Sequence, residues 1–456
     1  MTYSSLAIPE ASRLVFGSAP KPVECGFGLK IGAGQVYPEV NFTLPAITIS
    51  VETWTEVMAH YEEMAKNILQ RAISLQVPGL VLEFELLPAM TEVPQWGADI
   101  TAMLCGRMLQ VHQKHGLKCA LRVTPADIRD QGKPPQLRSG YAWEQLRRSF
   151  ELCIEAGAHI VSIESVGGKE VHDPGLMYGD IRSIAFALGV LAPRDVAWLW
   201  TQITRMCDGR GAVPGGDTAC GFGNTAMQLA HQKMLPEVMA AVVRAMSAVR
   251  SLVAFESGAV GPSKDCAYEG PILKAITGCP ISMEGKSAAC AHFSPVGNIA
   301  AAMCDLWSNE SVQNVRLLSG NAPEVFTEVL AYDCRLMNTA AASGGALYLR
   351  KWLVESDEYL SPQAAVLSPE ATIEIAEAIL AADSHYHAAV SAGVAAVGLL
   401  RKRVEAGCLN LSKKEAGWLT RIECELQSLP DDEAQLLAEM KATHAGVFNP
   451  ASYGLP

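Results

Sequence analysis

Short aliphatic runs alternate with amphipathic stretches through the first two thirds of the chain, and this alternation restricts the fold more than any other feature. The runs begin at Phe27, Pro78, Lys118, His159, Val196, Ala212, Ser251 and Cys279. Most of them are continuously apolar, as expected for parallel strands that helices cover on both faces. Eight strands that alternate with helices predict a (β/α)8 TIM barrel.

A doubly wound open sheet is the main alternative, because it shows the same alternation of strands and helices. Its fingerprint, G-x-G-x-x-G between a strand and a helix, is absent, since the last spacing in Gly26, Gly28 and Gly32 is wrong. The apolar runs stop after about Met303, and Glu324 to Ala341 and Pro369 to Ala442 have the composition of helices. We therefore expect a barrel domain over residues 1–305 and a helical extension over residues 306–456.

Charge and hydropathy argue against two classes of partner. The 36 basic and 48 acidic side chains give a net charge of -12, whereas nucleic-acid binding requires clustered Lys and Arg. The longest apolar run, Ala388 to Leu400, is shorter than the ~20 residues of a membrane span. The N-terminus lacks the basic start and apolar block of a signal peptide. We expect a soluble, cytoplasmic protein.

Acidic residues end five of the expected strands, and these are Glu85, Glu164, Asp217, Glu256 and Glu284. The C-terminal strand ends of a TIM barrel form its active site, so these carboxylates should converge on one mouth. Their mutual repulsion would have to be offset by a cation or by protonation. A bound metal ion would serve, and so would pairing with a nearby lysine, namely Lys169, Lys264 or Lys286.

Two cysteines enter the same expected loops, among glycines: Cys220 after the sixth run and Cys266 after the seventh. With Glu164 they would offer two thiolates and one carboxylate, and three ligands with an open fourth position are typical of catalytic zinc. A single free cysteine is more often an inert core residue, so spacing alone leaves both interpretations open. The 13 cysteines include no C-x-x-C pair, which argues against a disulfide framework or a zinc ribbon.

Several long motifs resemble one known family. They are GFGLKIGAGQVYPEVNF, SVGGKEV, GDTACGFGNTAM, RAMSAVRSLVAFESGAVGPSKDCAYE, KAITGCPISMEGK, CDLWSNESV, LAYDCRLMNTA and VFNPASYGL. Over nearly its whole length the chain resembles the zinc-containing methyltransferase subunit of the methanol:corrinoid protein methyltransferases of methanogens and acetogens. The resemblance is looser from Asp127 to Gly140 and from Ser343 to Leu429.

This resemblance implies a TIM barrel with one catalytic zinc ion, held by Glu164, Cys220 and Cys266. It implies a methyltransferase that activates methanol and moves its methyl group to the Co(I) corrinoid of a partner corrinoid protein, so that this chain carries no corrinoid itself. We also expect a homodimer within a larger hetero-oligomer. Four further acids at the mouth could orient ligands or deliver a proton, namely Glu85, Asp217, Glu256 and Asp265.

Three alternatives stay open at this point. The same zinc barrel could use another small methyl donor, such as a methoxylated aromatic compound, or it could bind a corrinoid protein without catalysis. The stretch Asp383 to Ala388 approaches the D-x-H-x-x-G motif of corrinoid-binding domains. However, the final Gly is replaced by Ala and the stretch lies in a helical pattern, so we interpret it as a solvated helix face.

Overall fold

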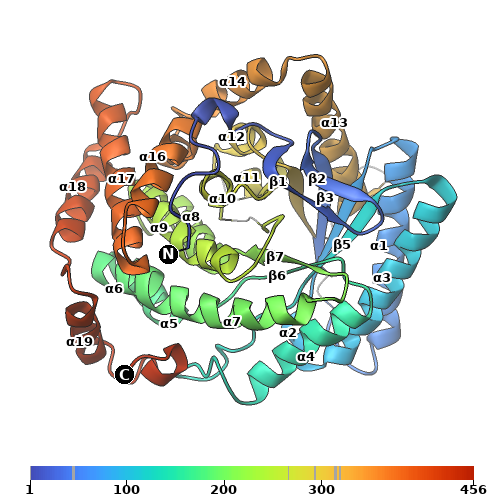
Figure 1. The fold of residues 1–456 in the computed structure, drawn as a ribbon, viewed down its shortest axis with the longest axis horizontal. Helices are drawn as coiled ribbons and strands as arrows, with labels where there is room; N and C mark the ends of the chain where they lie inside the picture. The colour runs from blue at the N-terminus through green and yellow to red at the C-terminus, as the bar shows by residue number, and fades with distance from the viewer. Residues whose placement is uncertain (1, 44–46, 265–266, 292–293, 313–315, 318–319) are drawn as a thin grey trace.

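Parallel strands curl around the centre of the molecule, and helices cover them (Figure 1). This computed structural model describes every residue except 1, 44–46, 265–266, 292–293, 313–315 and 318–319. Within the described residues the sheet has seven parallel strands in the order β7-β6-β5-β4-β3-β9-β8. Their bounds are Tyr37–Thr43 for β3, Leu80–Glu85 for β4, Cys119–Thr124 for β5, Ile160–Ile163 for β6, Val213–Asp217 for β7, Ser282–Glu284 for β8 and Leu306–Val312 for β9.

A short segment around Ser263 fills the space between the two edge strands, β7 and β8. On one side, the amide of Val260 donates to the carbonyl oxygen of Pro214 in β7 at 2.9 Å. On the other side, the amide of Ser282 in β8 donates to the carbonyl oxygen of Ser263 at 3.0 Å. The fold is therefore TIM-barrel-like, as the alternation predicts, and its sixth position in chain order is a bridge rather than a full strand.

Six of the eight expected runs form strands, five of them in the barrel sheet, and the other two lie in helices. The runs at Pro78, Lys118, His159, Ala212 and Cys279 form β4 to β8. The run at Phe27 forms β2 (Leu29–Ala33), which pairs with β1 (Ser18–Cys25) in a hairpin outside the barrel sheet. The runs at Val196 and Ser251 lie in the helices α7 (Ala192–Cys207) and α9 (Glu237–Glu256). A short apolar run looks the same in a buried helix and in a buried strand.

The expectation that strands stop near Met303 is also wrong. The strand β9 follows this residue and pairs in parallel with both β3 and β8. The helix α13 (Ala322–Ala342) then packs against β3 and β9. The division into a barrel and a helical extension at residue 305 stays a proposal, and β9 and α13 shift its boundary toward the C-terminus.

Helices surround the barrel in chain order. Besides α7, α9 and α13 they are α1 (Trp54–Ser74), α2 (Pro88–Glu92), α3 (Pro94–His115), α4 (Tyr141–Glu155), α5 (Lys169–Tyr178), α6 (Ile181–Phe186), α8 (Thr225–His231), α10 (Gly270–Thr277), α11 (Lys286–Ala291) and α12 (Gly297–Ala301). Two π-helices span Ala187–Leu191 and Cys220–Asn224. A small hairpin, β10 (Arg316–Leu317) and β11 (Gly320–Asn321), precedes α13.

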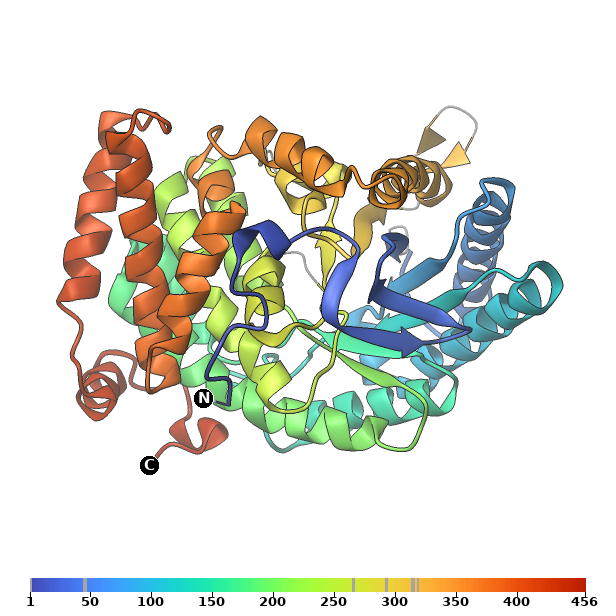
Figure 2. The ribbon, with the colours of Figure 1, turned by 45° about the horizontal axis from the view of Figure 1, so that its top comes forward.

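The expected C-terminal helices are present beside the barrel (Figure 2). They are α14 (Ala346–Asp357), α15 (Pro362–Leu367), α16 (Pro369–Leu380), α17 (His385–Glu405), α18 (Lys413–Gln427) and α19 (Glu433–Thr443). The helix α17 packs along α9 and also contacts α18, which lies outermost. Short 3-10 turns occur at Ala11–Arg13 and Pro450–Tyr453.

Two helical segments of the described chain are long and apolar enough, by composition alone, to cross a membrane. They are Ile181–Cys207 and Glu237–Glu256, and 78% and 100% of their most apolar windows are buried inside the fold. Over a window long enough to span a membrane, both segments are more apolar than the region around Ala388 to Leu400. Their burial is typical of core helices in a soluble fold.

Candidate functional site

Glu164 begins the loop that follows β6, and its side chain is 34% exposed. The backbone after it is held by two carboxylates. The amide of Ser165 donates to Oδ1 of Asp217 at 3.2 Å, and the amide of Val166 donates to Oδ2 of Asp127 at 3.1 Å. Because these acceptors come from the end of β7 and from the loop after β5, the tertiary fold determines the path of the loop that carries Glu164.

Asp217 ends β7 and is completely buried. Besides the amide of Ser165, its carboxylate accepts hydrogen bonds from Nε1 of Trp200 at 2.8 Å and from Nη2 of Arg250 at 3.1 Å. Arg250 also donates to the carbonyl oxygen of Ser165 at 3.2 Å and contacts its hydroxyl. A buried carboxylate with a guanidinium and two further donors is well satisfied. Asp217 therefore anchors the start of the Glu164 loop.

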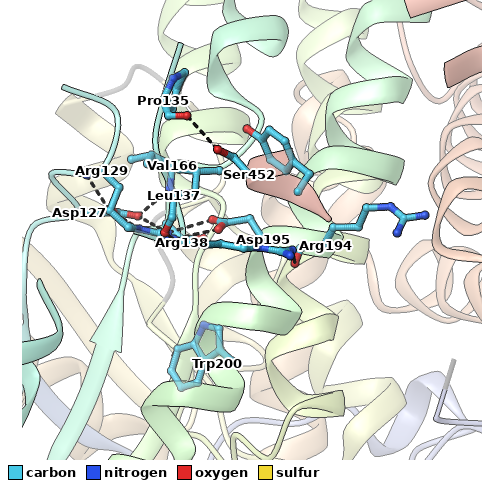
Figure 3. A network of polar contacts seen from close by, with 12 residues as sticks. Asp127, Arg129, Pro135, Leu137, Arg138, Val166, Arg194, Asp195, Trp200 and Ser452 are labelled. Carbon is cyan, nitrogen blue, oxygen red and sulfur yellow. Dashed lines mark hydrogen bonds and ion pairs between the residues drawn. The ribbon is translucent and has the colours of Figure 1, made fainter. Parts of the chain in front are cut away.

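The second anchor, Asp127, belongs to a buried ion network (Figure 3). Arg129 donates to Oδ2 of Asp127 at 2.7 Å and to Oδ1 of Asp195 at 2.8 Å, and all three side chains are fully buried. Asp195 also packs against the loop, because a Cβ atom on Gly167 would lie only 2.4 Å from its side chain. A residue larger than glycine at position 167 would displace the network or the loop.

Cys220 lies three residues after the end of β7 and begins the π-helix Cys220–Asn224. Nδ2 of Asn224 donates to its Sγ at 3.6 Å. The preceding amide, of Ala219, donates to Oε1 of Glu269 at 2.7 Å. Cys220 is half-buried, whereas seven other cysteines are buried. Burial raises the pKa of core thiols such as Cys153 to about 12, which keeps them protonated and unreactive.

The loops of Glu164 and Cys220 are joined to each other. Nζ of Lys169, at the start of α5, donates to the carbonyl oxygen of Gly221 at 2.9 Å. The ring of Phe222 lies 4.7 Å from the guanidinium of Arg250 and 4.8 Å from the ring of His172. Because β6 and β7 are adjacent strands, these contacts hold the two predicted ligands on neighbouring loops of one barrel face.

A lysine offsets the charge of the acids that converge at the mouth. Nζ of Lys264 lies 3.0 Å from Oε1 of Glu83 and 3.5 Å from Oε1 of Glu164, and it also contacts Glu85. Lys264 is only 4% exposed. The converging acids were expected to need a cation, and for two of them, Glu85 and Glu164, the structure supplies an ammonium group. Pairing with a nearby lysine, the alternative to a metal ion, is therefore present for Glu85 and Glu164.

The same lysine separates the protonation behaviour of two of these acids. Burial raises the pKa of the Glu83 carboxyl, and Lys264 opposes this shift only in part. Burial also pushes the pKa of Glu85 upward, but the ammonium of Lys264 outweighs it and leaves the pKa below its ordinary value. Glu85 therefore stays charged at neutral pH. Nδ2 of Asn41 donates to it at 3.1 Å.

The prediction that Glu256 lies at the mouth of the barrel is wrong. It ends the helix α9 rather than a strand, and its carboxylate binds the amide of Thr2 and Nε2 of His385, the latter at 2.7 Å. The chain then turns and Val260 contacts Pro214, near the start of β7. Glu256 thus lies at the end of the barrel opposite Glu164, because a helix in this fold runs back toward the strand starts.

Of the three remaining residues that were predicted to lie at the mouth, the structure describes one. Glu284 ends β8 and is buried. Asp265 and Cys266 lie outside the described residues. Within the described residues, no group of three His, Cys, Asp or Glu side chains could hold a metal ion, a search that does not include Cys266.

The donor set nevertheless fits a zinc ion. Glu164 supplies a carboxylate and Cys220 a half-buried thiol, on adjacent strand ends. Lys264, two residues before Cys266 in the sequence, contacts Glu164 and so brings this part of the chain to the same mouth. Zinc accepts one carboxylate and two thiolates, whereas magnesium and calcium prefer oxygen ligands to thiolates.

Sequence reasoning did not single out three buried charges that organise the mouth: Glu83, Arg129 and Glu269. Glu83 could have been found from the strand pattern LEFE, since alternate residues of a strand face the same side as Glu85. Glu269 is the last residue of the KDCAYE motif. Arg129 lies where the family resemblance is looser, and the sequence contains no signal for its role.

Glu170 on α5 leads to a prediction for pH dependence. Burial raises its pKa from 4.5 to about 7, although the hydroxyl of Tyr453 donates to Oε1 at 2.5 Å. Between these values the folded chain keeps a proton that the unfolded chain releases, so the free energy of unfolding falls as pH rises. Replacing Glu170 by glutamine should remove this loss. We expect the variant to gain thermal stability over the parent on going from about pH 5 to about pH 8.

Thermal unfolding of both proteins at several pH values measures this effect. The exposed Glu405→Gln is the matched control and should shift the unfolding midpoint equally at every pH. Parallel pH profiles for Glu170→Gln and the parent would contradict the prediction.

Comparison with known proteins adds three findings. Residues 1–454 match a family model described as methanol-cobalamin methyltransferase B subunit. The chain is 37% identical, over 99% of both sequences, to the methanol--corrinoid protein co-methyltransferase of Methanosarcina barkeri. It also resembles a chain in the crystal structure of the methanol:cobalamin methyltransferase complex MtaBC from Methanosarcina barkeri, with a TM-score of 0.95, 36% identity and 99% coverage of both chains.

Proposed function

This chain belongs to the methanol-cobalamin methyltransferase B subunit family, and on that premise we propose that it moves the methyl group of methanol to the Co(I) corrinoid of a separate corrinoid protein with the help of zinc. Its relative from Methanosarcina barkeri is named as a methanol--corrinoid protein co-methyltransferase. The observation that carries the proposal is the match over 99% of both chains, which includes the loops of Glu164 and Cys220.

We propose that Glu164, Cys220 and Cys266 hold the zinc ion. When bound, zinc supplies Lewis acidity that makes the hydroxyl group of methanol a better leaving group. The chain's own residues prepare the site. Lys264 lies beside Glu164, and the contact between Lys169 and Gly221 joins the two ligand loops. These contacts favour a site that is already organised before substrate binds.

The corrinoid belongs to the partner in this proposal, and the stretch that resembles a corrinoid-binding motif supports this division. Ser384 caps the helix α17 by accepting a hydrogen bond from the amide of His387. Nδ1 of His387 lies 2.5 Å from Oδ1 of Asp383, and its Nε2 lies 2.7 Å from the carbonyl oxygen of Asp431. Both ring nitrogens thus have partners within the chain, at the start of a helix rather than after a strand.

A methanol assay tests the proposed function. Purified chain, methanol and the cognate corrinoid protein in its Co(I) state should give methyl-corrinoid, followed by its absorbance. The same preparation should contain about one zinc ion per chain. If the corrinoid were methylated from a methoxylated aromatic compound but not from methanol, the methyl donor would be that compound instead of methanol. A complex that forms without any methylation would favour the non-catalytic alternative and contradict the proposal.

A homodimer within a hetero-oligomer and a cytoplasmic location also stay proposals. Two exposed aromatic residues on α14, Tyr348 and Trp352, are candidates for a contact between subunits. Light scattering on the chain alone and on its mixture with the corrinoid protein measures both stoichiometries.

A further inference from the structure

The end of the chain reaches the loop that begins at Glu164. The amide of Gly168 donates to the hydroxyl of Tyr453 at 2.8 Å, and this hydroxyl donates to Oε1 of Glu170 at 2.5 Å. Tyr453 is 1% exposed. One side chain therefore bridges the end of the loop and the first turn of α5, across 285 residues of sequence.

The segment that carries Tyr453 is itself fixed. The hydroxyl of Ser452 donates to the carbonyl oxygen of Pro135 at 3.2 Å (Figure 3). The ring of Phe448 packs between the rings of Tyr453 and Phe186, at centroid distances of 6.3 and 5.5 Å. Leu455 is also buried in this cluster. The tyrosine hydroxyl is thus presented from a packed support rather than from a loose chain end.

Three amides after Glu164 are each held by a side chain from a different part of the fold. Asp217 holds the first and Asp127 the second, and Tyr453 holds that of Gly168. Gly168 has a φ of +93°, a conformation that side chains other than glycine rarely adopt. The contact with Tyr453 therefore fixes the loop at Gly168. At this residue the backbone has a positive φ, and α5 begins directly after it.

We propose that Tyr453 is a positioning residue for Glu164: its hydroxyl holds Gly168 and so keeps the Glu164 carboxylate in place for the metal ion. This inference rests on the proposed function. Metal ligands act through the groups that orient them, and loss of such a group typically costs 10–100-fold in metal affinity or activity. The last residues of the chain are in this view part of the active site.

The variant Tyr453→Phe tests the inference, because it keeps the packed ring and removes only the hydroxyl. We expect zinc to pass to a chelating dye about 10–100 times faster than from the parent protein, and kcat for methanol to fall more than KM changes. Amide hydrogen exchange at residues 165–168 should also accelerate. The matched control is Tyr386→Phe, another fully buried tyrosine, whose hydroxyl donates to the carbonyl oxygen of Pro430 at 2.7 Å.

The inference is overturned if Tyr453→Phe retains zinc like the parent, if it protects residues 165–168 like the parent, or if Tyr386→Phe loses zinc equally fast. Zinc transfer and amide exchange need no methanol, so both report on Tyr453 even where methanol is not the substrate. If the parent protein binds no zinc, the proposed function fails, and amide exchange alone decides whether Tyr453 holds the loop.

Discussion

Replacing Cys220 by alanine is expected to remove the metal ion and to lower the rate of methyl transfer by more than about a hundredfold. Changes in groups that only orient a ligand typically cost 10–100-fold, and this variant would lose a proposed ligand itself. The remaining donors would be Glu164 and Cys266, too few for a firmly held zinc ion. Zinc content by mass spectrometry and the rate of corrinoid methylation, measured on one preparation, check both effects.

Cys408→Ala is the matched control for this prediction. Cys408 is exposed, in the turn after α17, and its thiol donates to the carbonyl oxygen of Ala406 at 3.7 Å. This variant should keep both zinc and activity. A zinc-free Cys220→Ala protein with the full rate of methyl transfer would refute the zinc assignment, and it would leave the family membership of the chain untouched.

Replacing Lys264 by methionine is expected to lower the free energy of unfolding by about 3–5 kcal/mol. The change keeps most of the side-chain volume and removes the ammonium group that Glu83, Glu85 and Glu164 share. Breaking a buried ion pair is costly because it leaves an uncompensated charge in a poorly solvated place. Urea denaturation followed by circular dichroism measures the loss.

Two further variants make this test specific. Lys286→Met removes a lysine that is 46% exposed and pairs with Asp333, so it should cost less than about 1 kcal/mol. Adding Glu83→Gln to Lys264→Met should restore part of the stability, since Glu83 is the most deeply buried of the three acids. The prediction would be refuted if the two lysine variants lost equal amounts of unfolding free energy, or if the double variant were no more stable than Lys264→Met. Lys264 would then not stabilise the fold by compensating the buried acids.

The barrel strands β4 and β5 are predicted correctly although each carries a buried charge, Glu83 or Arg122, because their other residues are mostly apolar. The strand β3 was missed because Glu39 and Asn41 point into a polar barrel interior, where Nε of Arg122 donates to Glu39 at 2.6 Å. In β3 these polar residues alternate with apolar ones, so the strand does not form the continuous apolar run by which the other strands are recognised. The apolar runs at Val196 and Ser251 misled for the opposite reason, because α7 and α9 are buried helices.

The amino-acid sequence by itself determined the barrel class, the family resemblance, and the placement of Glu164 and Cys220 at one end of the barrel. It could do so because the C-terminal ends of parallel strands always meet at one end of such a barrel. Only the tertiary structure decided that Lys264 pairs with the acids of the mouth, that Glu256 lies at the opposite end, and that Tyr453 reaches Gly168. These contacts join residues far apart in the chain, and they depend on how loops and helices pack, which local sequence patterns do not encode.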